Sequence, residues 1–139
     1  MKTIHVTRRL AYPQEMVWAA LTDSQHIEKW LMPNDFRPKV GHQFQFLTKP
    51  APGFDGIVDC KVLDLEPQSR LAFSWKGGGI DTKVTIFLSP LEAGTEVQLV
   101  QEGFKVSNII PRIILGQGWK TIIGKKLPTA IDGMAVEAV

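Results

Sequence analysis

The sequence has little of several features that would point directly to a function. It contains one cysteine, Cys60, so no disulfide can form within the chain and a reducing compartment is expected. The first residues lack the apolar run of a secretory signal. No stretch is long and apolar enough to span a bilayer. These absences predict a cytoplasmic protein without a membrane span.

Charge of one sign and the usual catalytic motifs are also missing. The 16 basic and 14 acidic residues leave a net charge of +2, which gives no electrostatic footprint for nucleic acid. His5, His26 and His42 are scattered without the spacing of metal ligands. Gly77–Gly79 lacks the lysine and the strand–loop–helix context of a phosphate loop. No nucleophile motif and no pair of inward carboxylates is visible, so the sequence predicts no metal, no cofactor and no catalytic residue.

What the sequence does contain is a clear order of periodic segments. Thr3–Ala11 alternates apolar and polar residues, as in a half-buried strand. Pro13–Leu21 fits a short helix that begins with proline. Thr22-Asp23 can cap a second short helix, which carries Ile27 and Trp30 on one side. No linker or repeat divides the chain, so residues 1–139 are expected to form a single domain.

The middle of the chain alternates with period two over several short segments. These are Phe44–Phe46, Gly56–Leu65, Leu71–Trp75, Thr82–Leu88 and Glu96–Glu102. Strands at this spacing with short turns form an antiparallel meander.

The last part of the chain has helical spacing from Pro111 onward. One stripe collects the apolar residues Leu115, Trp119, Ile122, Ile123, Leu127 and Ala130. Gly116 and Gly118 weaken the first turns, and Pro128 should kink or end the helix. A break between Ile113 and Trp119 is therefore the alternative to one long helix. With a single helix facing a strongly curved antiparallel sheet, a two-layer α+β architecture is expected.

Several local strings, taken in order, resemble the SRPBCC (START-like) superfamily, and within it the homologues of the heat-shock-protein-90 ATPase activator. The strings are Pro13–Trp18, Ala20–Asp23, Trp30, Phe36–Gly41 leading into Phe44–Phe46, Gly56–Trp75, Gly94–Val97, Glu102–Phe104 and Gly118–Trp119. The resemblance covers roughly residues 1 to 132. It implies the helix-grip fold, with a curved antiparallel sheet of about six or seven strands wrapped round a long C-terminal helix and two short helices after the first strand.

The sequence departs from this family at three places. Members often have a histidine where this chain has Gln101. The stretch Val106–Leu115 is more apolar than the connection expected there, and Pro128 falls inside the final helix. These departures bear on the role of the domain rather than on its fold.

A sheet curved round one helix often leaves apolar space between the two, as ligand pockets do. Aromatic walls suit a flat or amphipathic organic molecule. We therefore expect the inward-facing residues to line such a cavity. The predicted lining is Trp30, Phe44, Phe46, Val58, Phe73, Trp75, Val84, Ile86, Leu99, Gln101, Trp119 and Ile123.

Gln101 is the most informative polar position. It follows Val97 and Leu99 in phase, so its amide should point inward, where it needs hydrogen-bond partners. One interpretation is a structural hydrogen bond to the long helix, and the other is a polar anchor for a ligand. His42 is in phase with Phe44 and could reach the mouth of the cavity, although a surface position at the strand end is the plainer interpretation.

The apolar run Ile109–Leu115 cannot all face one helical stripe, because Ile113 and Ile114 lie off it. A short helix that packs as a lid would explain the run. A contact between two copies of the chain, or with another partner, would also explain it.

Three functions are consistent with these patterns. The first is binding of a small hydrophobic or amphipathic molecule between the sheet and the C-terminal helix. The second is an enzyme resembling the polyketide cyclases of the superfamily, which would need inward acid–base groups. The third is a co-chaperone or protein-interaction module, as the resemblance to the ATPase activator implies. The sequence favours binding, because Gln101 and His42 are the only inward polar groups on offer.

Overall fold

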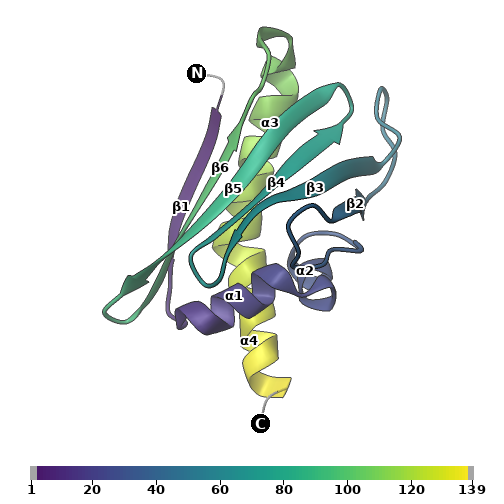
Figure 1. Cartoon of the computed structure of the whole chain (residues 1–139). Coiled ribbons are helices and arrows are strands. Elements are labelled where there is room, and N and C mark those ends of the chain that lie inside the picture. The colour runs from purple at the N-terminus through teal and green to yellow at the C-terminus, as the bar shows by residue number, and fades with distance from the viewer. Residues whose placement is uncertain (1–2, 138–139) are drawn as a thin grey trace.

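Six antiparallel strands form one sheet in the computed structural model, which describes residues 3–137 (Figure 1). Their order across the sheet is β1-β6-β5-β4-β3-β2, so five consecutive strands form a meander and the first strand closes it beside the last. The strands are β1 (Thr3–Leu10), β2 (Gln43–Leu47), β3 (Ile57–Glu66), β4 (Arg70–Gly77), β5 (Ile80–Leu91) and β6 (Gly94–Glu102). This confirms the predicted α+β architecture.

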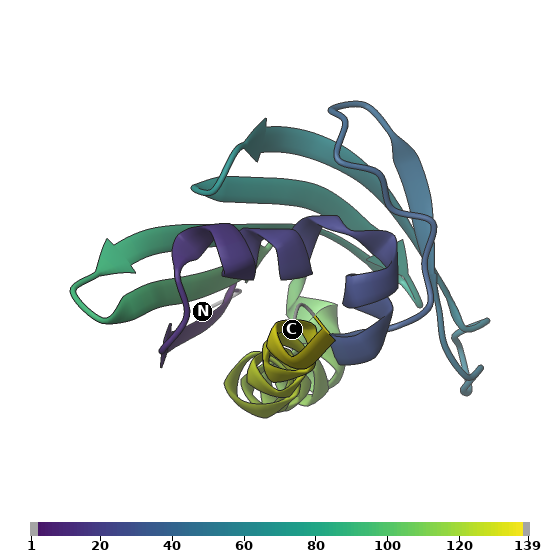
Figure 2. The same ribbon diagram turned by 90° about the horizontal axis from the view of Figure 1, so that it is seen from below.

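Side-chain alternation decides which face of the sheet is buried. In β6, Val97, Leu99 and Gln101 are buried, while the intervening residues are partly exposed. The register of β3 against β4 shifts between Val62 and Asp64, as at a β-bulge, which bends the strand and increases its twist. The sheet as a whole curves over the helices (Figure 2).

Two short helices follow β1, α1 (Gln14–Thr22) and α2 (Ser24–Trp30). The Asp23 carboxylate accepts from the backbone N–H groups of Gln25 at 2.9 Å and of His26 at 3.4 Å. Asp23 is therefore the N-cap of α2, as the sequence predicted.

The C-terminal helix runs without interruption from residue 109 to residue 137. It consists of α3 (Ile109–Thr121), a π-helical turn labelled η2 (Ile122–Lys126) and α4 (Leu127–Glu137), and a short 3-10 turn, η1 (Val106–Asn108), precedes it. The Leu127 N–H donates to the Ile122 carbonyl, five residues back. Pro128 follows directly, and the wider turn carries the helix past this residue without ending it.

The alternative of a break between Ile113 and Trp119 was wrong, and close packing against the sheet explains why. A Cβ added to Gly116 would lie 3.9 Å from Ile4 Cγ1 of β1, so this glycine sits where the helix comes near the strand. Tertiary packing outweighs the low helix propensity of glycine here. α3 packs along β1, and α4 packs against α1 and α2 (Figure 2).

Candidate ligand-binding site

Most of the space between sheet and helix is filled by an aromatic cluster. Ring centroids lie 5.4 Å apart between Phe44 and Phe46, 5.5 Å between Phe46 and Trp75, and 5.5 Å between Trp75 and Trp119. Phe73 joins the same cluster, 6.5 Å from Trp75. All five side chains are buried. The centre of the predicted cavity is therefore occupied by the protein's own side chains.

Gln101 lies at the helix end of this cluster and is fully buried. The Trp119 indole N–H donates to Gln101 Oε1 at 2.8 Å, and Gln101 Nε2 donates to Thr82 Oγ1 at 2.9 Å. The Thr82 hydroxyl in turn donates to the Trp75 carbonyl at 3.1 Å. The structural interpretation of Gln101 is thus confirmed, because the amide ties β5, β6 and α3 together.

An open apolar pocket of about 390 Å³ lies at one end of the cluster. The volume is in the range typical of small-molecule sites. β3, β4 and β5, the loop before β3 and the first turns of α3 all contribute to its wall. The lining residues are Met32, Thr48, Pro52, Gly53, Phe54, Val58, Trp75, Gly77, Gly78, Ile80, Ile110, Pro111, Ile114 and Leu115.

Glycines on the β4–β5 connection make room for one wall of this pocket. A Cβ added to Gly77 would lie 2.8 Å from the Ile57 carbonyl oxygen, and one added to Gly78, at φ +58°, would lie 3.3 Å from the Phe54 ring. The loop that carries Phe54 is held by two hydrogen bonds of 2.9 Å between the backbones of Ala51 and Phe54. Phe54 can therefore lie against the glycines and face the pocket.

The start of α3 forms the opposite wall. Ile110 and Ile114 lie one turn apart and both border the pocket, although they are 70% and 63% exposed. Ile109 and Ile113, on the adjacent side of the same turns, do not border it. The apolar run that sequence analysis singled out thus divides between the pocket rim and a separate exposed surface.

Two of the predicted lining residues, Val58 and Trp75, border the open pocket. The others are buried in the core or at its edge, away from the pocket: Trp30, Phe44, Phe46, Phe73, Val84, Ile86, Leu99, Gln101, Trp119 and Ile123. Trp30 lies on α2, and its indole N–H donates to the Ala20 carbonyl at 2.8 Å.

Phe54, Ile80 and Met32 also border the pocket, although they were not among the predicted lining residues. Phe54 stands in a Pro-Gly-rich loop, where alternation gives no direction for a side chain. The one sequence feature that could have indicated Phe54 is its place directly after Pro52-Gly53. Such a pair is typical of a turn, which can direct the next side chain back toward the domain.

Trp75 borders the pocket and carries an indole N–H. The indole N–H has no hydrogen-bond partner among the residues that the structure describes, and no polar side-chain atom in that part of the chain is both fully buried and unpartnered. The Trp75 N–H must therefore reach a surface. Thr48 is the one residue in the lining that carries a hydroxyl.

Titratable groups lie elsewhere. His42 is half-buried at the start of β2, where its Nε2 pairs with the Asp35 carbonyl at 2.9 Å. Burial, reinforced by the nearby carboxylates of Asp59 and Asp35, raises the pKa of the Cys60 thiol far above its usual range. Across residues 3–137 no three His, Cys, Asp or Glu side chains gather as metal ligands.

The chain is similar in sequence and fold to a known family and to several solved structures. The family model described as Activator of Hsp90 ATPase homolog 1-like protein matches residues 11–132. Protein MLL2253 from Mesorhizobium loti is 33% identical, with a TM-score of 0.87 over 94% of this chain and 96% of that one. Protein BH1534 from Bacillus halodurans is 26% identical, with a TM-score of 0.79 over 94% and 97% of the two chains.

CalU16 from Micromonospora echinospora, at 24% identity and a TM-score of 0.76, covers 97% of this chain and 79% of its own, and is similar in fold alone. No curated protein matches the sequence.

Proposed function

This chain belongs to the family of Activator of Hsp90 ATPase homolog 1-like proteins, and we propose that it binds a small hydrophobic or amphipathic molecule in the pocket between β4, the Phe54 loop and the start of α3. The observation that carries the proposal is the composition of the pocket wall. Its side chains are almost all apolar, with a tryptophan and a phenylalanine among them. Apolar walls with a few placed polar groups are the usual form of a ligand site.

The polar groups fit an amphipathic ligand with one acceptor. The Trp75 N–H can donate to a carbonyl or ether oxygen, and the Thr48 hydroxyl can donate or accept. The ring faces of Trp75 and Phe54 favour flat or conjugated groups. A ligand that combines an aromatic body with one oxygen acceptor therefore matches the wall better than a purely aliphatic chain does.

The chemistry of the wall favours binding over catalysis. Within the described residues, the pocket lining contains no Asp, Glu, His, Lys, Arg, Cys or Tyr. Proton transfer in an enzyme needs such a group within hydrogen-bond reach of the reacting atom. The enzyme and co-chaperone alternatives stay predictions, and no contact in this pocket favours either of them.

Titration with the neutral dye Nile red, whose emission rises in apolar surroundings, tests the proposal. We expect a saturable increase with one site per chain, accompanied by quenching of tryptophan emission because Trp75 lies in the wall. Ile114→Glu replaces an apolar contact on the rim with a charge and should weaken dye binding at least tenfold, since the bound dye would take water away from an unpaired carboxylate.

Ile113→Glu is the matched control. Ile113 is 53% exposed, next in sequence, and outside the pocket, so this variant has the same net charge and should bind the dye as the parent does. Equal losses in both variants, or no saturable response in the parent, would rule the proposal out. If the dye binds as expected, native mass spectrometry of protein purified from its host would identify the natural ligand.

A further inference from the structure

Five apolar residues at the start of the C-terminal helix form an exposed patch, here called the isoleucine tip. They are Val106, Ile109, Ile110, Ile113 and Ile114, each at least 50% exposed. The patch covers η1 and the first turns of α3, at the end of the molecule where the helix begins (Figure 1). Large aliphatic side chains gathered at one exposed end mark a surface that meets a partner.

The chain segment that contains the isoleucine tip carries charge of one sign, with Lys105 and Arg112 nearest the tip. Gly103 to Ile131 carries Lys105, Arg112, Lys120, Lys125 and Lys126 and no acidic residue, whereas the remaining residues hold 11 basic and 14 acidic side chains (16 − 5 and 14 − 0). The balanced net charge of the whole chain conceals this separation. An apolar patch with basic side chains beside it is the pattern of helices that bind at a membrane surface.

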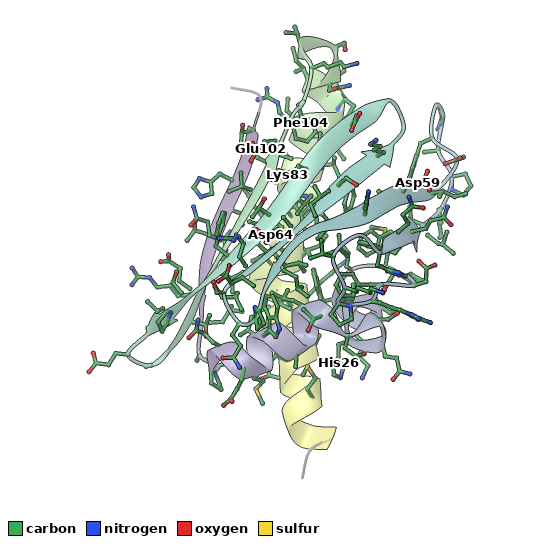
Figure 3. All side chains as sticks on the ribbon, viewed as in Figure 1. His26, Asp59, Asp64, Lys83, Glu102 and Phe104 are labelled. Carbon is green, nitrogen blue, oxygen red and sulfur yellow. The ribbon has the colours of Figure 1, made fainter. Side chains whose placement is uncertain are left out.

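The acidic residues on the neighbouring strands are offset by lysines. Glu102, at the end of β6 (Figure 3), lies opposite Lys83 of β5, and Asp81 of β5 lies opposite Lys76 of β4. Cross-strand pairs of opposite charge compensate one another. Asp55, in the loop before β3, is engaged by the Ile57 N–H at 3.0 Å. Lys105 lies next to the tip in the chain and Arg112 lies within it, and neither forms an ion pair with a described residue.

We propose that the isoleucine tip binds the surface of an anionic lipid bilayer, with the isoleucines entering the boundary between headgroups and acyl chains and the basic side chains facing the lipid phosphates. A second copy of the chain is the less favoured occupant. Two copies meeting through this patch would bring Arg112 and Lys105 of each close to those of the other, and like charges oppose such a contact. Anionic headgroups complement the same charges.

This inference does not depend on the proposed ligand. Ile109 and Ile113 belong to the tip but not to the pocket, while Ile110 and Ile114 belong to both. Among the described residues no helix meets the length and hydrophobicity needed to cross a bilayer, so the contact proposed is with the surface.

Flotation with vesicles of phosphatidylcholine, with and without phosphatidylglycerol, tests the inference on the full chain. We expect binding to the anionic vesicles that weakens as salt is added. Ile109→Ser combined with Ile113→Ser should lower the partition coefficient at least tenfold and leave Nile red binding unchanged. Lys105→Gln and Arg112→Gln should each lower it about fivefold.

The loop between α2 and β2 supplies matched controls. Arg37, Lys39 and Val40 are exposed there, Val40 at 56%, and Arg37→Gln, Lys39→Gln and Val40→Ser should each leave vesicle binding unchanged. Circular dichroism verifies that every variant is folded.

Three results would overturn the inference. The first is the absence of binding to anionic vesicles, and the second is equal losses in the tip and loop variants. The third is a dimer of the parent that the Ile109 and Ile113 substitutions convert to monomer, which would assign the patch to a second copy. If the parent protein binds anionic vesicles but shows no saturable Nile red binding, the ligand proposal alone is rejected.

Discussion

Replacing Gln101 with leucine should destabilise the domain through the partner that it leaves behind. The two side chains are similar in size, so the main loss is the acceptor for the Trp119 N–H, which bonds Gln101 Oε1 at 2.8 Å. Trp119 is 1% exposed and cannot turn to solvent. An orphaned buried donor costs about 1–3 kcal/mol, and the Thr82 hydroxyl keeps its bond to the Trp75 carbonyl. We expect Gln101→Leu to lower the free energy of unfolding by about 2 kcal/mol.

A double-mutant cycle with Trp119→Phe isolates this contribution. Trp119→Phe alone removes buried volume and leaves the Gln101 side-chain oxygen without a donor. It should lower the free energy of unfolding by about 2–4 kcal/mol. Once both polar partners are gone, neither is stranded. The double variant should therefore cost about 1–2 kcal/mol less than the sum of the single changes. Urea unfolding followed by far-ultraviolet circular dichroism measures all four proteins.

Trp30→Phe provides the control cycle. The Trp30 N–H bonds the Ala20 carbonyl rather than Gln101, so Gln101→Leu and Trp30→Phe should add to within about 0.5 kcal/mol. Additivity in the Trp119 cycle as well would refute the argument that the amide and the indole stabilise the domain as a pair.

Three further predictions concern other parts of the chain. Gly94, at φ +152°, passes so close to the Leu10 carbonyl that a Cβ cannot fit, so Gly94→Ala should cost at least about 3 kcal/mol in urea unfolding. A Cβ added to Gly133 on α4 would meet nothing within 4 Å, so Gly133→Ala should change the free energy of unfolding by about 1 kcal/mol or less. Equal effects of the two glycine substitutions would contradict the steric argument. Cys60 is buried, which raises the pKa of its thiol; iodoacetamide at pH 8 should label it slowly in the native protein and rapidly in urea, and rapid native labelling would contradict its burial. A hydrogen bond to Asp132 raises the pKa of Tyr12, so its stabilisation is present below the unfolded pKa of about 10 and is lost as pH rises through the folded pKa. The melting temperature of Tyr12→Phe should therefore lie below that of the parent at neutral pH and converge with it in alkali, and a difference that grows with pH would be the wrong sign.

The sequence identified the strands and their buried faces because period two reports directly which way a side chain points. Val97, Leu99 and Gln101 all face inward as their alternation predicts. Alternation does not report the distance to the opposite layer. Phe44 and Phe46 were expected to border empty space, but their rings contact each other and Phe73 instead.

The pocket could not be predicted for a related reason. Its wall depends on Phe54, whose loop has no periodicity, and on two glycines that let the ring approach the β4–β5 connection. Such contacts are set by turn geometry and long-range packing, which single-residue patterns do not contain. The alternative of a break in the helix was wrong for a similar reason, because the low helix propensity of glycine does not report the packing of α3 along β1.

The π-helical turn also sets the phase of the helix. Leu115, Trp119, Ile123, Leu127 and Ile131 recur every four residues, and all are buried or half-buried. In an α-helix, a four-residue repeat drifts about 40° per step, or about 160° from the first of these residues to the last. The one additional residue in the turn at Ile122–Lys126 takes back about 100° of that drift. Trp119, beneath the sheet, and Ile131, against α1 and α2, can therefore stand in one row. Deleting Gly124 would therefore convert the turn to regular α-helix and leave α3 and α4 in the same relative phase.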